Sequence, residues 1–332
     1  MEVGLVIKEQ YQVVEHIGRG GMADVWSARD QRLNRLVAIK TIAQSLSTEV
    51  DPIALFQQEA QTIAKMEHPH ILPIYDFGDY RNNLYIVMRY VTGGSLEDKL
   101  EEQPLSLQDT LTIAQSIAQA LDYAHANNVI HLDLKPPNIL MDSGGSAYLA
   151  DFGLATVLDK SGRAQNPGSG TLLYMAPEQL TAEIIDHRAD IYWFAVMVFH
   201  MLTGTLPFDG TAPLAIKQLQ YQQGLPDLSE FDENIPYQIT DILRQGTSVE
   251  PSQRQPTLLD IVNQMREAIQ AVTIDLGATW DDDFDPHYGM ETAITLDIDD
   301  AGLLEAADIY TRAKHVWAGG NGRFLLGVSH FM

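Results

Sequence analysis

The apolar residues of this chain follow mainly strand-like spacing before residue 93 and long helical spacing after it, and this change constrains the fold more than any other feature. Residues 11–92 contain short runs of β-branched and aromatic residues between polar ones, a pattern typical of strands. Residues 107–127, 190–202 and 257–271 instead show long helical periods. The pattern predicts an α+β fold, in which a small β-rich lobe precedes a larger helical lobe and a ligand cleft can form between the two.

The charge balance excludes several classes of function. The chain has 21 Lys and Arg against 45 Asp and Glu, a net charge of −24. Nucleic acids and anionic membranes require a basic surface, so we expect binding to neither. Solubility is the simplest explanation of the charge, and a preference for basic protein substrates is the second.

Cysteine is absent, which excludes disulfides, thiolate nucleophiles and Cys-based zinc sites. The amino terminus lacks the basic and apolar regions of a signal peptide, and the most apolar stretch, residues 191–202, is too short to span a bilayer. We therefore expect a cytoplasmic protein without membrane insertion.

A glycine-rich segment lies between two strand-like runs. Residues 18–23 read GRGGMA, with Gly18, Gly20 and Gly21. Glycines let a backbone approach phosphates closely, with amide groups available as donors. A tight hairpin explains the segment equally well, so this motif alone leaves the choice open.

Lys40 ends an apolar strand, VAIK, and its ammonium leaves a buried element there. Such a charge is costly unless it meets an anion or reaches solvent. Glu59 lies within the helical period of residues 52–66 that follows, and it could pair with Lys40. An ion pair of this kind would hold the lysine against phosphates.

The strongest chemical motif is HLDLKPPNIL, residues 131–140. Its two prolines exclude a regular helix or a central strand, so we expect a rigid loop. Within six residues the loop brings together Asp133, Lys135 and Asn138. The carboxylate can accept a proton from a hydroxyl, the ammonium can neutralise phosphate charge, and the amide can ligate a divalent ion.

Two further acidic residues follow the loop. Asp151 begins the sequence DFG after the strand-like residues 147–150, and a carboxylate at a strand end is a good Mg²⁺ ligand. Glu178 lies in the sequence APE, and Arg254 could pair with it in a buried ion pair. We interpret this second pair as architectural.

Together these motifs resemble the protein kinase signature set, and specifically the eukaryotic-like serine/threonine kinases of bacteria. The resemblance covers residues 11–268. It implies a bilobal kinase domain, with an N-lobe over residues 11–92 and a C-lobe over residues 93–268. The implied reaction transfers the γ-phosphate of ATP to a serine or threonine hydroxyl of a protein substrate, with Mg²⁺ or, as an alternative, Mn²⁺.

A rival interpretation is a pseudokinase that binds nucleotide and acts as a scaffold or switch. Pseudokinases commonly lack at least one ionisable residue of the set, whereas this chain retains all five, which are Lys40, Glu59, Asp133, Asn138 and Asp151. The complete set favours the active enzyme. Whether a regulatory dimer forms stays open.

The resemblance also assigns the nucleotide-binding residues by position. Around the adenine it places the apolar side chains of Ile17, Val25, Ala38 and Leu140. Met88 corresponds to the gatekeeper, and Arg89 and Val91 correspond to the hinge residues with backbone hydrogen bonds. The phosphates would meet the glycine loop and Lys40, which Glu59 would hold.

In the same way, Asp133 corresponds to the catalytic base, and Lys135 is typical of the serine/threonine branch. Asn138 and Asp151 correspond to the metal ligands. Thr171 resembles the threonine that contacts the catalytic aspartate, and Asp190 corresponds to the residue that anchors the catalytic loop. Glu178 and Arg254 correspond to a structural pair.

Three positions depart from the family pattern. Leu132 replaces an arginine that normally binds a phosphorylated activation loop, so we predict activity without a phosphate docked there. Ala23 replaces a glycine of the phosphate loop, and we expect only a modest change in nucleotide affinity. Ala195 replaces a glycine within a helix, where alanine is better by about 0.8–1 kcal/mol, so we expect a benign or stabilising change.

The composition changes again near Thr273. From there to Thr311 the chain has eleven acidic residues and no Lys or Arg, which is typical of a solvated segment. We interpret residues 273–299 as an acidic linker. Residues 300–332 regain a helical period before a glycine-rich end, and both a second module and a disordered tail stay open.

Overall fold

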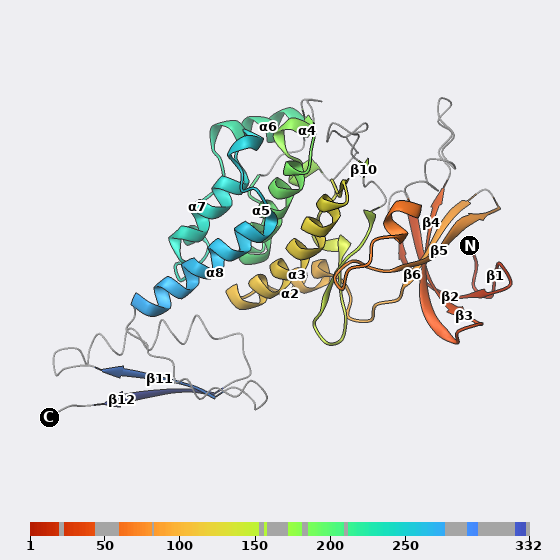
Figure 1. The fold of residues 1–332 in the computed structure, drawn as a ribbon, viewed down its shortest axis with the longest axis horizontal. Coiled ribbons are helices and arrows are strands. Elements are labelled where there is room, and N and C mark those ends of the chain that lie inside the picture. Colours follow the sequence, from red (N-terminus) through yellow and green to blue (C-terminus); the bar gives the residue numbers. More distant parts are fainter. Residues whose placement is uncertain are drawn as a thin grey trace.

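The computed structural model describes residues 1–19, 23–43, 60–81, 83–152, 156–157, 172–180, 185–208, 212–275, 291–297 and 323–329. Figure 1 shows a twisted sheet on one side and a group of helices on the other. We call them the sheet lobe (residues 6–89) and the helical lobe (residues 96–275). The predicted α+β architecture, with the sheet preceding the helices, is confirmed.

The sheet lobe is one antiparallel sheet with the strand order β1-β2-β3-β4-β6-β5. Its strands are β1 (Val6–Ile7), β2 (Tyr11–Arg19), β3 (Ala23–Asp30), β4 (Arg35–Ala43), β5 (Ile74–Tyr80) and β6 (Asn83–Arg89). Alternate residues of the strands point to one face, because successive side chains in a strand point to opposite sides. Those on the inner face, such as Val13, Ala28, Ile39 and Val87, form the small core of this lobe.

The sequence pattern is strand-like from Ile71 to Phe77, but strand β5 begins at Ile74, three residues later. The backbone N–H of Leu72 donates to the carbonyl of Leu149 instead, and Pro73 has no N–H to offer a neighbouring strand. Ile71 forms a bridge with the same leucine. Residues 71–72 therefore tie the sheet lobe to the helical lobe.

The helical lobe contains α2 (Leu96–Glu102), α3 (Leu107–Ala126), α4 (Pro177–Leu180), α5 (Arg188–Thr203), α6 (Pro213–Gln222), α7 (Tyr237–Gly246) and α8 (Leu258–Asp275). Serines cap the first two: Ser95 forms a capping box with Asp98, and the Ser106 hydroxyl accepts from the Asp109 N–H. Helix α5 ends at Gly204, whose φ of 69° suits glycine. The predicted core helices are confirmed.

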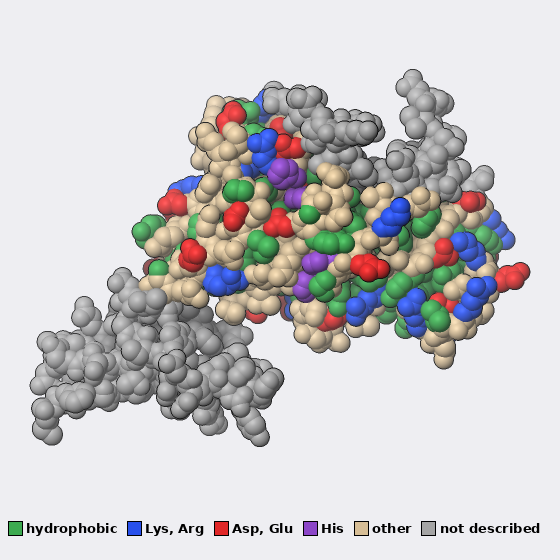
Figure 2. Space-filling view, in the orientation of Figure 1, with side chains coloured by type: hydrophobic (Ala, Val, Ile, Leu, Met, Phe, Trp, Pro, Cys, Tyr) green, Lys and Arg blue, Asp and Glu red, His purple; other side chains and the backbone are tan. Residues whose placement is uncertain are grey.

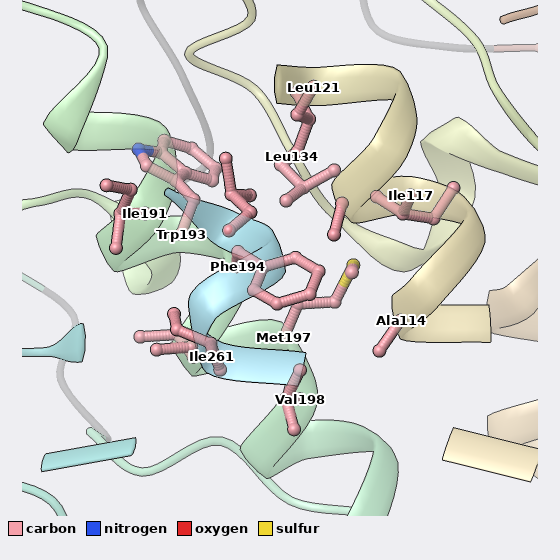
Figure 3. Packing of buried hydrophobic residues seen from close by; sticks show 14 of the residues in the cluster. Ala114, Ile117, Leu121, Leu134, Ile191, Trp193, Phe194, Met197, Val198 and Ile261 are labelled. Atoms are coloured by element: carbon pink, nitrogen blue, oxygen red, sulfur yellow. The ribbon is translucent and has the colours of Figure 1, made fainter. Parts of the chain in front are cut away.

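Helix α5 lies at the centre of the helical lobe, and side chains from its whole circumference are buried. Figure 3 shows Trp193, Phe194 and Met197 of α5 packed among side chains of α3 and Ile261 of α8. A helix that is apolar on all sides must be surrounded by other elements. Helix α5 therefore provides a rigid base for the loop of residues 131–135, which contacts its first turn.

Short strands and 3₁₀ turns lie between the helices of the helical lobe. They are β7 (Val129–Ile130), η1 (Pro136–Asn138), β8 (Ile139–Met141), β9 (Ala147–Leu149), β10 (Thr156–Val157), η3 (Leu172–Tyr174), η4 (Leu228–Glu230) and η5 (Pro251–Gln253). Strands β8 and β9 form a hairpin, and β7 pairs with β10, both antiparallel. The predicted proline-containing loop contains one 3₁₀ turn, η1, and its last two residues, 139–140, belong to β8.

Beyond α8, β11 (Glu291–Asp297) pairs in parallel with β12 (Arg323–Ser329). The sequence pattern did not suggest a strand within the acidic stretch of residues 273–299. The helix expected over residues 300–315 lies outside the described residues. Among the described helices, none combines the length and apolar content needed to cross a bilayer.

On the face shown in Figure 2, acidic and basic side chains are interspersed over the described surface. The excess of negative charge is partly a property of residues 273–311, which hold eleven of the 45 acidic residues.

Candidate active site

The structure brings together three of the predicted site residues on the loop between β7 and β8. The Asp133 carboxylate is buried, and the Lys135 ammonium lies 3.0 Å from its Oδ2. Asn138 Nδ2 donates to the Asp133 carbonyl at 2.7 Å and to its Oδ2 at 3.1 Å. These bonds use the amide nitrogen of Asn138, so the amide oxygen is the atom left for a cation.

Asp190, at the start of α5, holds this loop from below. Its Oδ2 accepts from the His131 N–H at 2.8 Å and contacts His125 Nε2 at 2.7 Å, and its Oδ1 accepts from the Leu132 N–H at 2.8 Å. Burial alone would raise the pKa of Asp190, but the hydrogen bond and charge of His125 and the neighbouring His131 outweigh it and lower the pKa. The aspartate therefore stays ionised and keeps its three donors.

Leu132 has a φ of 58° and no exposed surface. Its side chain is part of the core of the helical lobe. The left-handed backbone is unusual for leucine, and the buried Asp190 contact holds it in place. The side chain is thus an apolar core residue and offers no charge to an anion.

Across the cleft, the Lys40 ammonium of β4 forms an ion pair with the Asp151 carboxylate. Asp151 follows β9 with a φ of 63°, and the next residue, Phe152, packs its ring against that of His131 at 4.8 Å between centroids. The predicted partner of Lys40, Glu59, lies outside the described residues. Among the described residues, the lysine meets Asp151, the expected metal ligand, and the predicted Lys40–Glu59 pair stays a prediction.

The two halves of the site are joined through Ala150, the residue before Asp151. Its N–H donates to the Asn138 carbonyl at 2.8 Å, and its carbonyl contacts His131 Nε2 at 3.0 Å. The loop with Asp133 and the segment with Asp151 are therefore in fixed register.

Three of the residues expected around an adenine pack against one apolar cluster. Met88, Val91 and Leu140 pack against a cluster of Leu72, Tyr148 and Ala150. On the sheet side, Ala38 is buried, Val25 is half-buried and Ile17 is exposed. Gly18 lies in β2 opposite Val25, whereas Gly20 and Gly21 lie outside the described residues.

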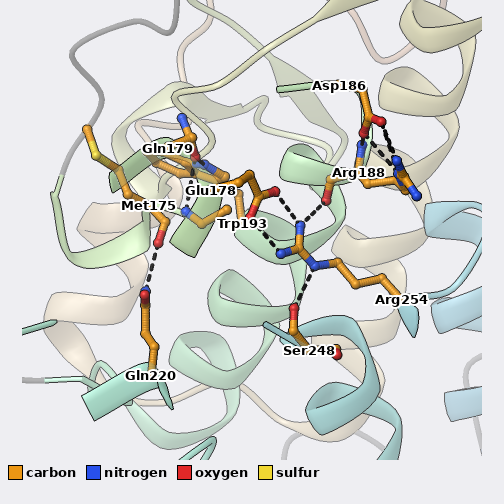
Figure 4. Close-up of polar contacts among 10 residues, drawn as sticks. Met175, Glu178, Gln179, Asp186, Arg188, Trp193, Gln220, Ser248 and Arg254 are labelled. Carbon is orange, nitrogen blue, oxygen red and sulfur yellow. Dashed lines mark hydrogen bonds and ion pairs between the residues drawn. The ribbon is translucent and has the colours of Figure 1, made fainter. Parts of the chain in front are cut away.

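Away from the cleft, Arg254 and Glu178 form the predicted ion pair (Figure 4). Arg254 Nη1 lies 2.7 Å from Glu178 Oε1 and Nη2 lies 2.8 Å from Oε2, with both side chains buried. The guanidinium also donates to the carbonyls of Ser248 and Arg188. Thr171, earlier in the same segment, lies outside the described residues.

Sequence reasoning missed several supporting contacts. His125 on α3 contacts Asp190, the Gln179 amide oxygen accepts from Trp193 Nε1 at 2.6 Å, and the Tyr174 hydroxyl meets His200 Nδ1 at 2.7 Å. Each joins residues on different elements. No spacing in the sequence connects them, so only the folded chain identifies these pairs.

A family model described as "Protein kinase domain" matches residues 11–266. The chain is 32% identical over 278 residues to the probable serine/threonine-protein kinase PknB of Lactococcus lactis, covering 83% of this chain and 44% of that protein. It is 34% identical over 273 residues to the serine/threonine-protein kinase PrkC of Bacillus subtilis, covering 82% and 42%. The chain thus spans about two fifths of the length of these curated relatives.

The fold is also similar to a solved structure. The crystal structure of the Mycobacterium tuberculosis PknI kinase domain aligns with a TM-score of 0.66 at 26% identity, covering 81% of this chain and 99% of that chain. The sequence match, the bilobal fold and the residues gathered around Asp133 and Asp151 agree. This chain belongs to the protein kinase family.

Proposed function

We propose that this chain is an active serine/threonine protein kinase, which transfers the γ-phosphate of ATP to a hydroxyl of a protein substrate. The observation that carries the proposal is the double contact of Ala150 with Asn138 and His131, because it aligns the loop of Asp133 with the segment of Asp151. Phosphoryl transfer depends mainly on positioning and charge stabilisation, and this register supplies the positioning.

Asp133 is the group that receives the proton of the substrate hydroxyl. Its carboxylate is buried, and Lys135 and Asn138 hold its Oδ2. This support orients the carboxylate before the substrate arrives, which is what a proton acceptor requires. Lys135 lies close enough to neutralise charge on the transferred phosphoryl group.

The donor set suits a magnesium ion, because the Asn138 amide oxygen and the Asp151 carboxylate are hard oxygen ligands. When bound, the ion would neutralise phosphate charge. Lys40 neutralises Asp151 in the described structure, and it would turn to the phosphates of a bound nucleotide. The cluster of Met88, Val91 and Leu140 provides the apolar slot that an adenine ring needs.

The kinase domain would span residues 11–268, and ATP chemistry indicates a cytoplasmic location. Residues 273–299 would link it to whatever residues 300–332 form, and the β11–β12 pair favours some structure there over a fully extended linker. A protein substrate and ATP are the partners that this function implies.

Activity should not require a phosphate docked beside the catalytic loop. Leu132, which occupies the position of the family's phosphate-binding arginine, is a buried core residue. Treatment with a phosphatase is expected to leave the kinase rate within about twofold, because no guanidinium is lost from a phosphate contact there. A fall to background would contradict this prediction.

The catalytic assignment is tested by Asp133→Asn. Phosphate transfer from Mg·ATP to a basic protein substrate should fall by about 10²–10⁴-fold, since the proton acceptor is removed. Asp109→Asn, on the exposed start of α3, is the matched control and should keep the wild-type rate. Equal transfer by wild type and Asp133→Asn would contradict the assignment, and nucleotide binding without transfer by wild type would indicate a scaffold.

A further inference from the structure

The side chain of Arg89 crosses from the sheet lobe to the helical lobe. Arg89 ends β6, and its backbone N–H donates to the Pro73 carbonyl at 3.0 Å. Its guanidinium carbon lies 4.7 Å from the centre of the Tyr148 ring, which belongs to β9. A guanidinium at this distance from an aromatic ring is within the range of a cation–π contact.

Residues 89–94 connect the sheet lobe to the helical lobe, and their other end also contacts the β8–β9 hairpin. The Gly93 N–H donates to the Met141 carbonyl at 2.9 Å, and the Met141 N–H donates to the Gly94 carbonyl at 2.9 Å. A Cβ atom on Gly93 would lie only 2.5 Å from the Met141 carbonyl oxygen, so this approach requires glycine. Residues 89–94 are therefore attached to one hairpin at both ends.

The ring that Arg89 covers is itself fixed. Tyr148 is 8% exposed, and its hydroxyl donates to Asp142 Oδ2 at 3.1 Å. Asp142 Oδ1 accepts from the backbone N–H groups of Gly144 and Ser146, both at 2.9 Å. These bonds, with that of Ser146 the largest, lower the pKa of Asp142 and keep it an acceptor. Tyr148 is thus a rigid platform.

Tyr148 belongs to the apolar cluster at the proposed adenine site. Tyr148 pairs with Leu140 in the β8–β9 register, and Leu140, Met88 and Val91 pack against the cluster that contains Tyr148. Met88 precedes Arg89 in the chain. A change in the position of Arg89 over the ring would therefore move two walls of the slot relative to the third.

We propose that Arg89 is a positioning residue for nucleotide binding, whose guanidinium over the Tyr148 ring sets the separation between Met88 and Val91 on one side and Leu140 on the other. The inference rests on the proposed function, because it assigns the adenine to this slot. It concerns the Arg89 side chain and is separate from any backbone hydrogen bond that the residue offers.

The first test compares Arg89→Gln with wild type for binding of Mg·ADP by calorimetry. Loss of the cation–π contact should raise the dissociation constant about twofold to fivefold. Arg89→Lys keeps a cation and should restore part of the affinity. Arg81→Gln is the matched control, because Arg81 lies over the Tyr80 ring at 5.2 Å at the far end of the sheet and should leave binding unchanged.

The second test separates the ring from its hydroxyl. Tyr148→Phe retains the ring but loses the hydroxyl bond to Asp142, so its affinity for Mg·ADP should lie between those of wild type and Tyr148→Leu, whereas Tyr148→Leu should weaken binding as Arg89→Gln does. The double variant Arg89→Gln/Tyr148→Leu should be no weaker than the weaker single variant, since both remove one contact. If the increases in dissociation constant of the two single variants multiplied in the double variant, the two residues would act independently and the proposal would be wrong.

Kinase assays on the full chain distinguish positioning from general damage. Arg89→Gln should raise the KM for ATP by the same factor as the dissociation constant, while kcat at saturating ATP falls by less than the KM rises. Equal affinity of wild type and Arg89→Gln for Mg·ADP would refute the role of Arg89 and leave the proposed function intact. Absence of Mg·ADP binding by wild type would instead refute the proposed function.

Discussion

Two ion pairs join distant parts of this chain, and they are built in opposite ways. Glu178 and Arg254 meet in the helical lobe through two parallel hydrogen bonds, with side chains that are 5% and 0% exposed. Lys40 and Asp151 meet across the cleft through a single carboxylate oxygen, with side chains that are 17% and 32% exposed. The first pair has further backbone partners, whereas the second borders the site where a nucleotide would bind.

The difference shows how burial decides what an ion pair does. A buried bidentate pair cannot be broken without leaving a charge in the protein interior, so it holds the chain in one arrangement. A partly exposed pair is screened by water and can exchange partners at little cost. The pair in the helical lobe is therefore suited to hold the architecture, whereas Lys40 and Asp151 can separate and, under the proposed function, would bind phosphates and a metal ion.

The largest expected effect comes from breaking the buried pair. Arg254→Met should lower the free energy of unfolding by about 3–5 kcal/mol, because Glu178 would lose its bidentate partner while its charge stays buried. Urea denaturation measures the change. The double variant Arg254→Met/Glu178→Leu removes both charges and should recover a large part of the loss. A loss below about 1 kcal/mol for Arg254→Met would show that the buried Glu178–Arg254 pair contributes no more to stability than a partly exposed pair does.

Packing around α5 offers a second measure of how rigid the helical lobe is. A Cβ atom added to Gly246, at the end of α7, would lie 2.8 Å from the Cβ of Ala195 on α5. Gly246→Ala should therefore destabilise the fold by about 1–3 kcal/mol through overpacking. Adding Ala195→Gly removes the opposing methyl group and should restore part of that loss in thermal denaturation, whereas strictly additive losses would contradict the contact.

The exposed pair should behave differently. Lys40→Met is expected to change the free energy of unfolding by less than about 1 kcal/mol, since both partners reach water. Phosphate transfer should nevertheless fall to near background, because the residue that meets the phosphates is lost. Lys8→Met breaks a more exposed pair with Asp76 on the same sheet and should leave the rate unchanged. A strong destabilisation of Lys40→Met would show that the Lys40–Asp151 pair is needed to hold the fold together.

The smallest effect is a pH dependence. Burial would raise the pKa of Asp186, but the hydrogen bonds and charge of Arg188 outweigh it and hold the pKa below the ordinary value of 3.8. The stabilisation is therefore complete above pH 3.8 and is lost as the pH falls through the lower value of the folded protein. The difference in free energy of unfolding between wild type and Asp186→Asn should shrink on acidification from pH 6 to pH 3. A difference that stays constant over this range would contradict the role of Asp186.

Much of the fold could be predicted because the signals are local. The strand-like runs around Val13, Trp26 and Ile39 became β2, β3 and β4, and the long helical periods became α3, α5 and α8. The catalytic loop was identifiable from Asp133, Lys135 and Asn138, since these residues lie within six positions of each other. Periodicity and short spacing are properties that the sequence displays directly.

Contacts between distant residues were predicted less completely. The Glu178–Arg254 pair was expected from the resemblance and is present. The contact of Lys40 with Asp151 was not expected, and neither were the His125–Asp190 bond or the position of Arg89 over Tyr148. In each case both residue types have several plausible partners, and packing alone selects among them.

By itself, the sequence determined the order of the lobes, the elements within them and the residue types at the site, because hydrophobic period and turn chemistry act over a few residues. The tertiary structure decided which charges are buried, which side chain supports which, and that Leu132 lies in the core instead of facing an anion. These outcomes depend on how α5 and the sheet bring together segments that are far apart along the chain, and burial then sets the strength of every polar contact that results.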